Sequence, residues 1–377
     1  MKRLQQELIQ KDLNKKLVFL VGPRQVGKTW LAKQIAKDYK KNVYLNYDQI
    51  EDRKIISQQA WIDSTALLIF DELHKMKGWK NYLKGVFDTK PPEQKILVTG
   101  SARLDTFRQF GDSLAGRFFV HRLLPFSLKE LLDSEYESDT EELLEQLLER
   151  GGFPEPFLAS ELNDSARWRN QYVDGLIRHD VLDFEMLHDL KTMSTLVELL
   201  RRRVGSPVSY LALAEDLAVS PTTVKKYIGI LEGLFVVFRV TPYSKNIARS
   251  LLKEPKIYFY DNGMVIGDDG IKFENLVAVS LLKHVWGKSD YEGSKLNLNY
   301  LKTKDDKEVD FCITDFDKVH LIVEVKLSDK EISKNLRYFS EKYDLKGVQL
   351  VKNLRQERKE GKIELRRASG FLSELWL

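Results

Sequence analysis

The chain has 377 residues, which is too long for one ordinary hydrophobic core, so we expect about two or three domains. A hydrophobic fraction of 43% and a charged fraction of 31% are typical of a soluble globular protein, and a net charge of +4 permits a nucleic-acid partner without indicating one. The single cysteine, Cys312, excludes an internal disulfide, and no run reaches the roughly 18 apolar residues of a membrane span. With no hydrophobic signal region at the N-terminus either, we expect a cytoplasmic protein without a membrane partner.

The first predicted strand, Leu17–Val21, leads into the phosphate-binding loop Gly22-Pro23-Arg24-Gln25-Val26-Gly27-Lys28-Thr29. Its two glycines let backbone N–H groups turn inward toward a β-phosphate. Lys28 is expected to reach the β- and γ-phosphates and Thr29 to ligate Mg²⁺, while a helix from Lys28 to about Tyr39 adds its positive N-terminal end. The alternative is a surface turn that binds nothing. The predicted nucleotide contacts are Gly22, Pro23, Arg24, Gln25, Val26, Gly27, Lys28, Thr29 and Trp30.

A second strand is predicted at Asn42–Tyr47, and a third at Ala66–Glu72 that is apolar until its two final acids. Such an apolar run is typical of a strand buried on both faces of a parallel sheet. It would deliver Asp71 and Glu72 at its carboxyl end, beside the phosphates. We expect Asp71 to hold Mg²⁺ and Glu72 to orient and deprotonate the attacking water. Acidic residues also follow strands simply to begin a helix, and that alternative stays open.

The next strand, Lys95–Thr99, ends in a polar tip, and arginines precede another apolar strand. Ring-type ATPases place a γ-phosphate sensor at such a tip, so Thr99 or Ser101 is a candidate to bind the lytic water; the alternative is a plain turn. Arg117 is a candidate arginine finger that would act on a neighbouring subunit, or else an ordinary surface arginine.

These motifs resemble the prokaryotic AAA-type ATPases of the archaeal-ATPase-like group, whose ATPase is fused to a C-terminal region of unknown function. The resemblance runs the length of the chain. It implies ATP hydrolysis with Mg²⁺ as cofactor and self-assembly into a homo-oligomer, a ring such as a hexamer. The residues that carry it are Gly22–Thr29, Leu67–Glu72, Thr99–Ser101, and Leu114–Arg117 followed by Leu124–Ser127.

The middle of the chain is predicted to be helical. We expect residues 1–135 to form the ATPase core and residues 136–204 to form a helical lid or linker, with two amphipathic helices between Asp164 and about Arg203. Gly151 and Gly152 mark a break in the pattern, which is either a hinge or an ordinary stiff turn.

Residues 205–255 have the pattern of a winged helix-turn-helix. A short helix at Ser209–Leu217 precedes a turn, Ser220 caps a second helix at Pro221–Leu231, and an apolar strand follows at Leu234–Val240. The alternative to DNA binding is a protein-interaction module. If the second helix contacts DNA, the facing residues are Thr222, Thr223, Lys225 and Lys226.

The last predicted domain, residues 256–377, resembles the restriction-endonuclease-like fold, whose signature is an acid followed by Glu-x-Lys on adjacent strands. The expected elements are a strand at Ile257–Tyr260, a helix opening at Phe273, strands at Leu296–Leu301, Glu308–Ile313 and Val319–Val325, a helix at about Lys330–Tyr343 and a strand at Gly347–Val351.

The candidate metal site of this domain consists of Glu274, Asp310 and Glu324. Asp310 and Glu324 would bind a divalent metal that activates water, and Lys326 would orient that water without being a ligand. Each acid lies in an apolar strand, where an unpaired charge is costly. The alternative is a structural ion pair, Asp310–Lys326 or Glu324–Lys326, in a degenerate nuclease fold.

The sequence therefore predicts an α/β protein with a P-loop parallel sheet, a helical lid, a winged helix and a nuclease-like domain. The leading function is a Mg²⁺-dependent ATPase that remodels or moves on DNA. The alternatives are a nucleotide-controlled switch that binds protein partners and an ATP-regulated, metal-dependent endonuclease.

Overall fold

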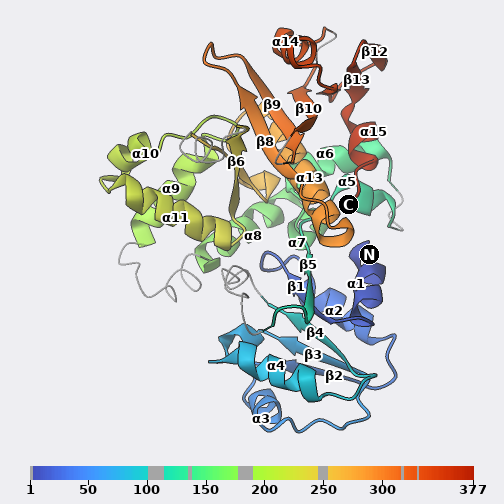
Figure 1. The fold of residues 1–377 in the computed structure, drawn as a ribbon. Helices are drawn as coiled ribbons and strands as arrows, with labels where there is room; N and C mark the ends of the chain where they lie inside the picture. The colour runs from blue at the N-terminus through green and yellow to red at the C-terminus, as the bar shows by residue number, and fades with distance from the viewer. Residues whose placement is uncertain are drawn as a thin grey trace. The chain divides into compact units, whose positions relative to one another are not determined.

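The computed structural model describes residues 3–100, 114–134, 138–176, 190–244, 254–315, 318–328 and 331–377. The chain forms two compact units (Figure 1). The first unit comprises Met1–Leu124 with Gly233–Phe235, and the second comprises Pro125–Glu232 with Val236–Leu377. Among the described residues, no helix is long and apolar enough to cross a membrane.

The first unit is built on a five-stranded sheet in the order β2-β3-β4-β1-β5, with every neighbouring pair parallel. Strands β1 and β3 are buried at every position, as their continuous apolar sequences predict. The parallel α/β sheet expected for a P-loop protein is thus confirmed. Its strands are β1 (Leu17–Val21), β2 (Asn42–Asn46), β3 (Leu67–Asp71), β4 (Lys95–Thr99) and β5 (Phe118–Arg122), and its helices are α1 (Gln5–Leu13), α2 (Lys28–Ala36), α3 (Ile50–Gln58), η1 (Leu73–Lys75) and α4 (Trp79–Thr89).

Aromatic side chains fix helix α4 against this sheet. Trp79, Leu83 and Val86 recur at helical spacing and are buried. The Trp79 ring meets Phe19 of β1 edge to face, with ring centroids 5.9 Å apart, and Phe19 meets Phe118 of β5 in the same way at 5.4 Å. The Phe19 ring of β1 therefore contacts both α4 and β5.

Two element boundaries in this unit differ from expectation. Helix α2 ends at Ala36, three residues before the predicted Tyr39, because the next amides bond to carbonyls three residues back in a tightened turn. Strand β3 ends at Asp71, and Glu72 follows in the left-handed conformation with φ of 56°.

The second unit contains an eight-stranded mixed sheet in the order β12-β13-β11-β10-β9-β8-β6-β7. Its strands are β6 (Val237–Pro242), β7 (Lys256–Phe259), β8 (Asn297–Lys302), β9 (Glu308–Thr314), β10 (Val319–Lys326), β11 (Gly347–Val351), β12 (Arg358–Glu360) and β13 (Ile363–Arg367). Its helices are α5 (Leu128–Leu132), α6 (Thr140–Arg150), α7 (Pro154–Leu158), α8 (Leu162–Gly175), α9 (Leu190–Arg201), α10 (Tyr210–Leu217), α11 (Pro221–Gly233), η4 (Asn262–Met264), α13 (Asp269–Glu292), α14 (Lys334–Tyr343) and α15 (Ala368–Ser373).

Helices α10 and α11 lie where the two helices of the turn motif were predicted. The Ser220 hydroxyl accepts a hydrogen bond from the Thr223 amide at 3.0 Å, so the predicted cap is present. Strand β6 begins at Val237, three residues later than expected, and Phe235 between α11 and β6 has a left-handed φ of 55°. Strand β6 pairs antiparallel with β7 and parallel with β8, so this hairpin is continuous with the C-terminal strands.

The predicted C-terminal strands lie within one residue of their expected bounds, but several other elements differ, and α14 begins at Lys334 rather than at about Lys330. Helix α13 begins four residues before Phe273, because Asp268 caps it by accepting the Ile271 amide at 2.9 Å. The sequence patterns did not predict β12, β13 or α15. At the expected break near Gly151, φ is 74° and a side chain would collide with the Asp261 carboxylate, so close packing requires glycine there.

Candidate functional site

The loop between β1 and α2 has the backbone that its glycines predict. Gly22 has φ of 148°, and a β-carbon there would collide with the Leu123 carbonyl, which follows β5. Gly27 has φ of 97° and is the N-terminal cap of α2. Both positions therefore need glycine, and the loop ends at a helix N-terminus, which favours anions.

The Lys28 side chain folds back over this loop. Its ammonium donates hydrogen bonds to the carbonyls of Gly22 at 2.9 Å and Pro23 at 2.5 Å, and the residue is 8% exposed. These hydrogen bonds hold the ammonium against the backbone of the loop.

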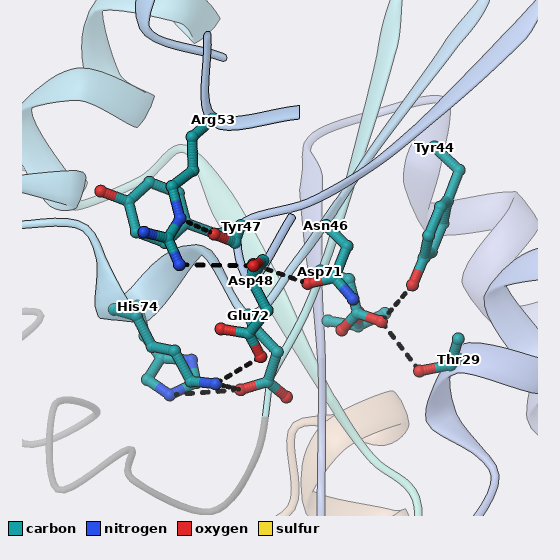
Figure 2. Close-up of polar contacts among 11 residues, drawn as sticks. Thr29, Tyr44, Asn46, Tyr47, Asp48, Arg53, Asp71, Glu72 and His74 are labelled. Carbon is teal, nitrogen blue, oxygen red and sulfur yellow. Dashed lines mark hydrogen bonds and ion pairs between the residues drawn. The ribbon is translucent and has the colours of Figure 1, made fainter. Parts of the chain in front are cut away.

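The Asp71 carboxylate, at the end of β3, is the centre of a hydrogen-bond network that includes Thr29 and Tyr44 (Figure 2). Oδ2 accepts from the Thr29 hydroxyl at 2.8 Å and from the Tyr44 hydroxyl at 2.5 Å. Oδ1 accepts from the Thr99 hydroxyl. The structure thus brings together the predicted residues Thr29, Asp71 and Thr99, and Asp71 is nearly buried.

Sequence analysis missed Tyr44. Strand β2 lies beside β3, and Asn46 is opposite Asp71, so Tyr44 two residues earlier lies on the same face as Asn46. With the strand order known, the alternation of side chains along β2 would have placed Tyr44 on the face of Asn46. Burial and the Asp71 hydrogen bond raise the pKa of Tyr44, so it remains a donor.

The predicted base, Glu72, lies among cationic and imidazole groups. Its Oε2 is 3.6 Å from Lys75 Nζ and 3.6 Å from His74 Nε2, and Lys75 also pairs with Asp48 at 2.5 Å (Figure 2). Burial raises the pKa of Glu72, and the positive charge of Lys75 opposes that rise. A carboxylate with a raised pKa is better able to take a proton from water.

The other predicted residues of this site are more scattered. Arg117 forms a two-pronged ion pair with Asp88, with Nε to Oδ1 at 2.8 Å and Nη2 to Oδ2 at 3.2 Å, and this pair lowers the pKa of Asp88. Trp30 is 42% exposed on α2. Ser101, the alternative sensor, lies outside the described residues.

A second cluster of charged residues lies within the second unit, where the metal site was predicted. Asp310 on β9 accepts a hydrogen bond from the Val325 amide of β10 at 2.8 Å. Glu324 pairs with Lys326 at 3.0 Å, which is one of the two structural pairs considered above. Glu274 on α13 accepts from the Tyr258 hydroxyl at 2.7 Å.

Sequence analysis also missed Lys256, which lies among these acids. Its side chain is 2% exposed, and Nζ is 2.7 Å from Glu308, 3.6 Å from Glu274 and 3.9 Å from Asp310. The sequence feature that could have indicated it is a lysine at the start of an otherwise apolar strand, on the same face as Tyr258.

The carboxylates of this cluster repel one another. Burial, with the charge of Asp310, raises the pKa of Glu274 and of Glu324 to about 7 each, and burial also raises the pKa of Asp310. No group of three or more Asp, Glu, His or Cys side chains in the described part of the chain is arranged to hold a metal ion. The metal site at Glu274, Asp310 and Glu324 therefore stays a prediction.

Comparison with known proteins identifies the parts of the chain. Residues 14–132 match the family described as AAA domain. Residues 141–272 and 269–368 match two domains of unknown function, DUF8612 and DUF4143. The predicted phosphate-binding loop at residues 22–29 lies within the part that matches the AAA domain.

The relatives found by sequence carry the description uncharacterized protein. A protein of Mycobacterium bovis is 27% identical over 66% of this chain, and the match spans only 55% of that relative's length. A protein of Methanocaldococcus jannaschii is 24% identical over 86% of this chain and 80% of its own. Among solved structures, a Walker-type ATPase of Pyrococcus abyssi aligns over 69% of this chain and 93% of its own, with 14% identity and a TM-score of 0.46.

Proposed function

Because residues 14–132 form an AAA domain, we propose that this protein binds and hydrolyses ATP with Mg²⁺. The observation that carries the proposal is the hydrogen bond of 2.8 Å between the Thr29 hydroxyl and the Asp71 carboxylate. It joins the end of the phosphate loop to the acid at the tip of β3. Hydroxyl and carboxylate oxygens form a donor set that suits Mg²⁺, and an ion bound there would neutralise charge on the β- and γ-phosphates.

Each residue of the site has a role in this proposal. The loop amides bind the phosphates, and the Lys28 ammonium exchanges the carbonyls of Gly22 and Pro23 for phosphate oxygens. Glu72 takes a proton from the attacking water. The Thr99 hydroxyl donates a hydrogen bond to Asp71. We also propose that Thr99 or Ser101 contacts the γ-phosphate.

Steady-state ATP hydrolysis tests these roles. We expect Lys28→Ala to lose nucleotide binding, and Glu72→Gln to bind ATP but lose turnover. Lys37→Ala is a matched control, because Lys37 lies just past the end of α2 and pairs with Gln34 outside the loop. A Glu72→Gln protein that hydrolyses ATP at the wild-type rate would refute the assignment of the base.

We further propose that the protein assembles into a ring and uses hydrolysis to remodel or move on DNA. The support for DNA is the α10–α11 pair followed by the β6–β7 hairpin, with Thr222, Lys225 and Lys226 exposed on the second helix. The test is hydrolysis with single-stranded, duplex and branched DNA at fixed low salt, because phosphate contacts weaken steeply with salt. A rate unaffected by every DNA would favour the nucleotide-controlled switch and direct the search to protein partners.

A metal-dependent endonuclease is a second candidate for the C-terminal domain. The observation in its favour is Glu324, which is 5% exposed and whose Oε2 accepts no hydrogen bond from the described residues. A buried carboxylate oxygen without a donor is costly, and a divalent cation shared with Asp310 would satisfy it. Metal-dependent cutting of DNA that is lost in Asp310→Asn would support this activity.

A further inference from the structure

The most enclosed cation of the second unit is the ammonium of Lys256. Lys256 opens β7, where it pairs with Val240 of β6 and bridges to Pro207 on its other side. Its Nζ lies 5.4 Å from the centre of the Tyr300 ring. The side chain is 2% exposed, so this charge has little access to water.

Three carboxylates compensate for that loss of water. Glu308 and Asp310 alternate along β9 and so share a face, while Glu274 comes from α13, which packs against β7 and β8. With carboxylate oxygens of Glu308, Glu274 and Asp310 at 2.7, 3.6 and 3.9 Å from Nζ, the buried ammonium ion is compensated by opposite charge. The ion is therefore held by oxygens from two separate elements.

The same oxygens suit a different cation. Carboxylates from a helix and a strand that converge on one point are the donors that hard divalent ions take. Negative charge is also in excess here, since three ammonium groups lie beside four carboxylates. The ammonium groups are those of Lys256, Lys302 and Lys326, and the carboxylates are those of Glu274, Glu308, Asp310 and Glu324. The buried Glu324 carboxylate on β10 adds further negative charge to this part of the sheet.

We propose that the Lys256 ammonium occupies the place of a divalent cation among Glu274, Glu308 and Asp310, and thereby excludes a metal ion from that place. Removing the ammonium should convert these three carboxylates into a site for Mn²⁺ or Mg²⁺. The proposal concerns this place only and does not depend on nuclease activity. A metal shared by Asp310 and Glu324 would be additional.

The test counts Mn²⁺ ions bound per chain by equilibrium dialysis, without nucleotide. Every protein in the test also carries Asp71→Asn, so that the Mg²⁺ site proposed in the first unit does not contribute to the count. We expect Lys256→Met to bind one Mn²⁺ more than the parent, and the added Glu308→Gln change to weaken that ion. Lys283→Met is the matched control, because Lys283 is equally buried and pairs with Glu130, away from Glu274, Glu308 and Asp310. Equal counts for the parent and Lys256→Met would overturn the proposal.

A folding defect does not prevent the test. Lys256→Met can lose stability in metal-free buffer, because three carboxylates are then left without their cation. The unfolding midpoint is therefore measured with and without Mn²⁺ for Lys256→Met and Lys256→Gln. We expect Mn²⁺ to raise the midpoint of both variants more than that of Lys283→Met. Variants that stay unfolded in Mn²⁺, or that gain no stability from it, count against the proposal.

Mn²⁺ binding by the parent protein distinguishes this proposal from that of the metal-dependent nuclease. Mn²⁺ bound by the parent and lost in Glu324→Gln would indicate the site shared with Asp310. A parent that binds none would remove support for the nuclease, and the difference between Lys256→Met and the parent would still decide the role of Lys256.

Discussion

The Tyr44 hydroxyl donates a hydrogen bond of 2.5 Å to Asp71 Oδ2, the same oxygen that accepts from Thr29 at 2.8 Å. Strand β2 therefore supplies a positioning group to the acid that we assign to Mg²⁺. The Lys33 ammonium lies 4.8 Å from the centre of the Tyr44 ring and helps to fix the ring in place. Tyr44 thus connects the orientation of Asp71 to helix α2.

Tyr44→Phe is expected to raise the Mg²⁺ concentration needed for half-maximal hydrolysis about fivefold. The reason is that Asp71 loses one orienting hydrogen bond, worth about 1 kcal/mol. A Mg²⁺ titration of hydrolysis at saturating ATP measures the change. Tyr47→Phe is the matched control, because the Tyr47 ring contacts Arg53 and not Asp71. An unchanged Mg²⁺ requirement in Tyr44→Phe would contradict the positioning role.

Lys75→Ala is expected to shift the acid limb of the pH–rate profile to higher pH. Glu72 must be ionised to act as a base, and Lys75 lowers its pKa against the effect of burial. Without Lys75 the pKa rises further, so activity is lost at a higher pH as the solution is acidified. Turnover measured from about pH 5 to about pH 9 tests this shift, with the exposed Lys77→Ala as control. Coincident acid limbs would show that Glu72 does not set the profile.

Local patterns predicted the parts of the site that depend on one segment of chain. The two glycines, Lys28 and Thr29 follow one strand directly, and Asp71 ends another, so their places depend on strand ends alone. The predicted strands β3, β4 and β11 lie at or within one residue of their observed bounds for the same reason. A parallel sheet then brings its carboxyl ends to one edge, which unites Thr29, Asp71 and Thr99.

Contacts between distant segments were not predictable from those patterns. Tyr44 reaches Asp71 only because β2 is the neighbour of β3, and Lys256 meets Asp310 through the packing of β7, α13 and β9. The partner of Arg117 is Asp88, from helix α4. In each case the deciding fact is which elements are adjacent, and a single sequence does not carry that information.

Arg117→Ala is expected to lower turnover on the order of 10³-fold while ATP binding is retained, if the arginine stabilises transition-state charge in a neighbouring subunit. Mixing Arg117→Ala with Glu72→Gln should then restore hydrolysis, because some interfaces combine an intact base from one variant with an intact arginine from the other. The comparison is the rate of the mixture against the sum of the separate rates.

The ion pair with Asp88 provides the accompanying control. Asp88→Ala removes the partner of Arg117 and leaves the guanidinium available, so we expect turnover to be maintained or increased. Lys84→Ala, which removes another positive charge near Asp88, should behave as wild type. A mixture that shows no recovery would limit Arg117 to its ion pair on α4.

The buried carboxylates Glu274 and Glu324 are expected to make the second unit less stable as pH rises. Their pKa values of about 7 in the folded chain exceed the ordinary value, so the folded state binds more protons than the unfolded state between about pH 4.5 and pH 7. The associated stability is complete below that window and is lost as pH rises through it. For one carboxylate the change is at most about 3 kcal/mol.

Glu324→Gln should therefore flatten this pH dependence, because its amide does not ionise and the repulsion with Asp310 disappears. Denaturant unfolding at about pH 5 and about pH 8 measures the change, and hydrogen exchange of the β9 and β10 amides assigns it to the second unit. Glu341→Gln, an exposed change on α14, should retain the wild-type dependence. If Glu324→Gln loses as much stability as wild type between the two pH values, the buried Glu324 carboxylate is not the group that titrates.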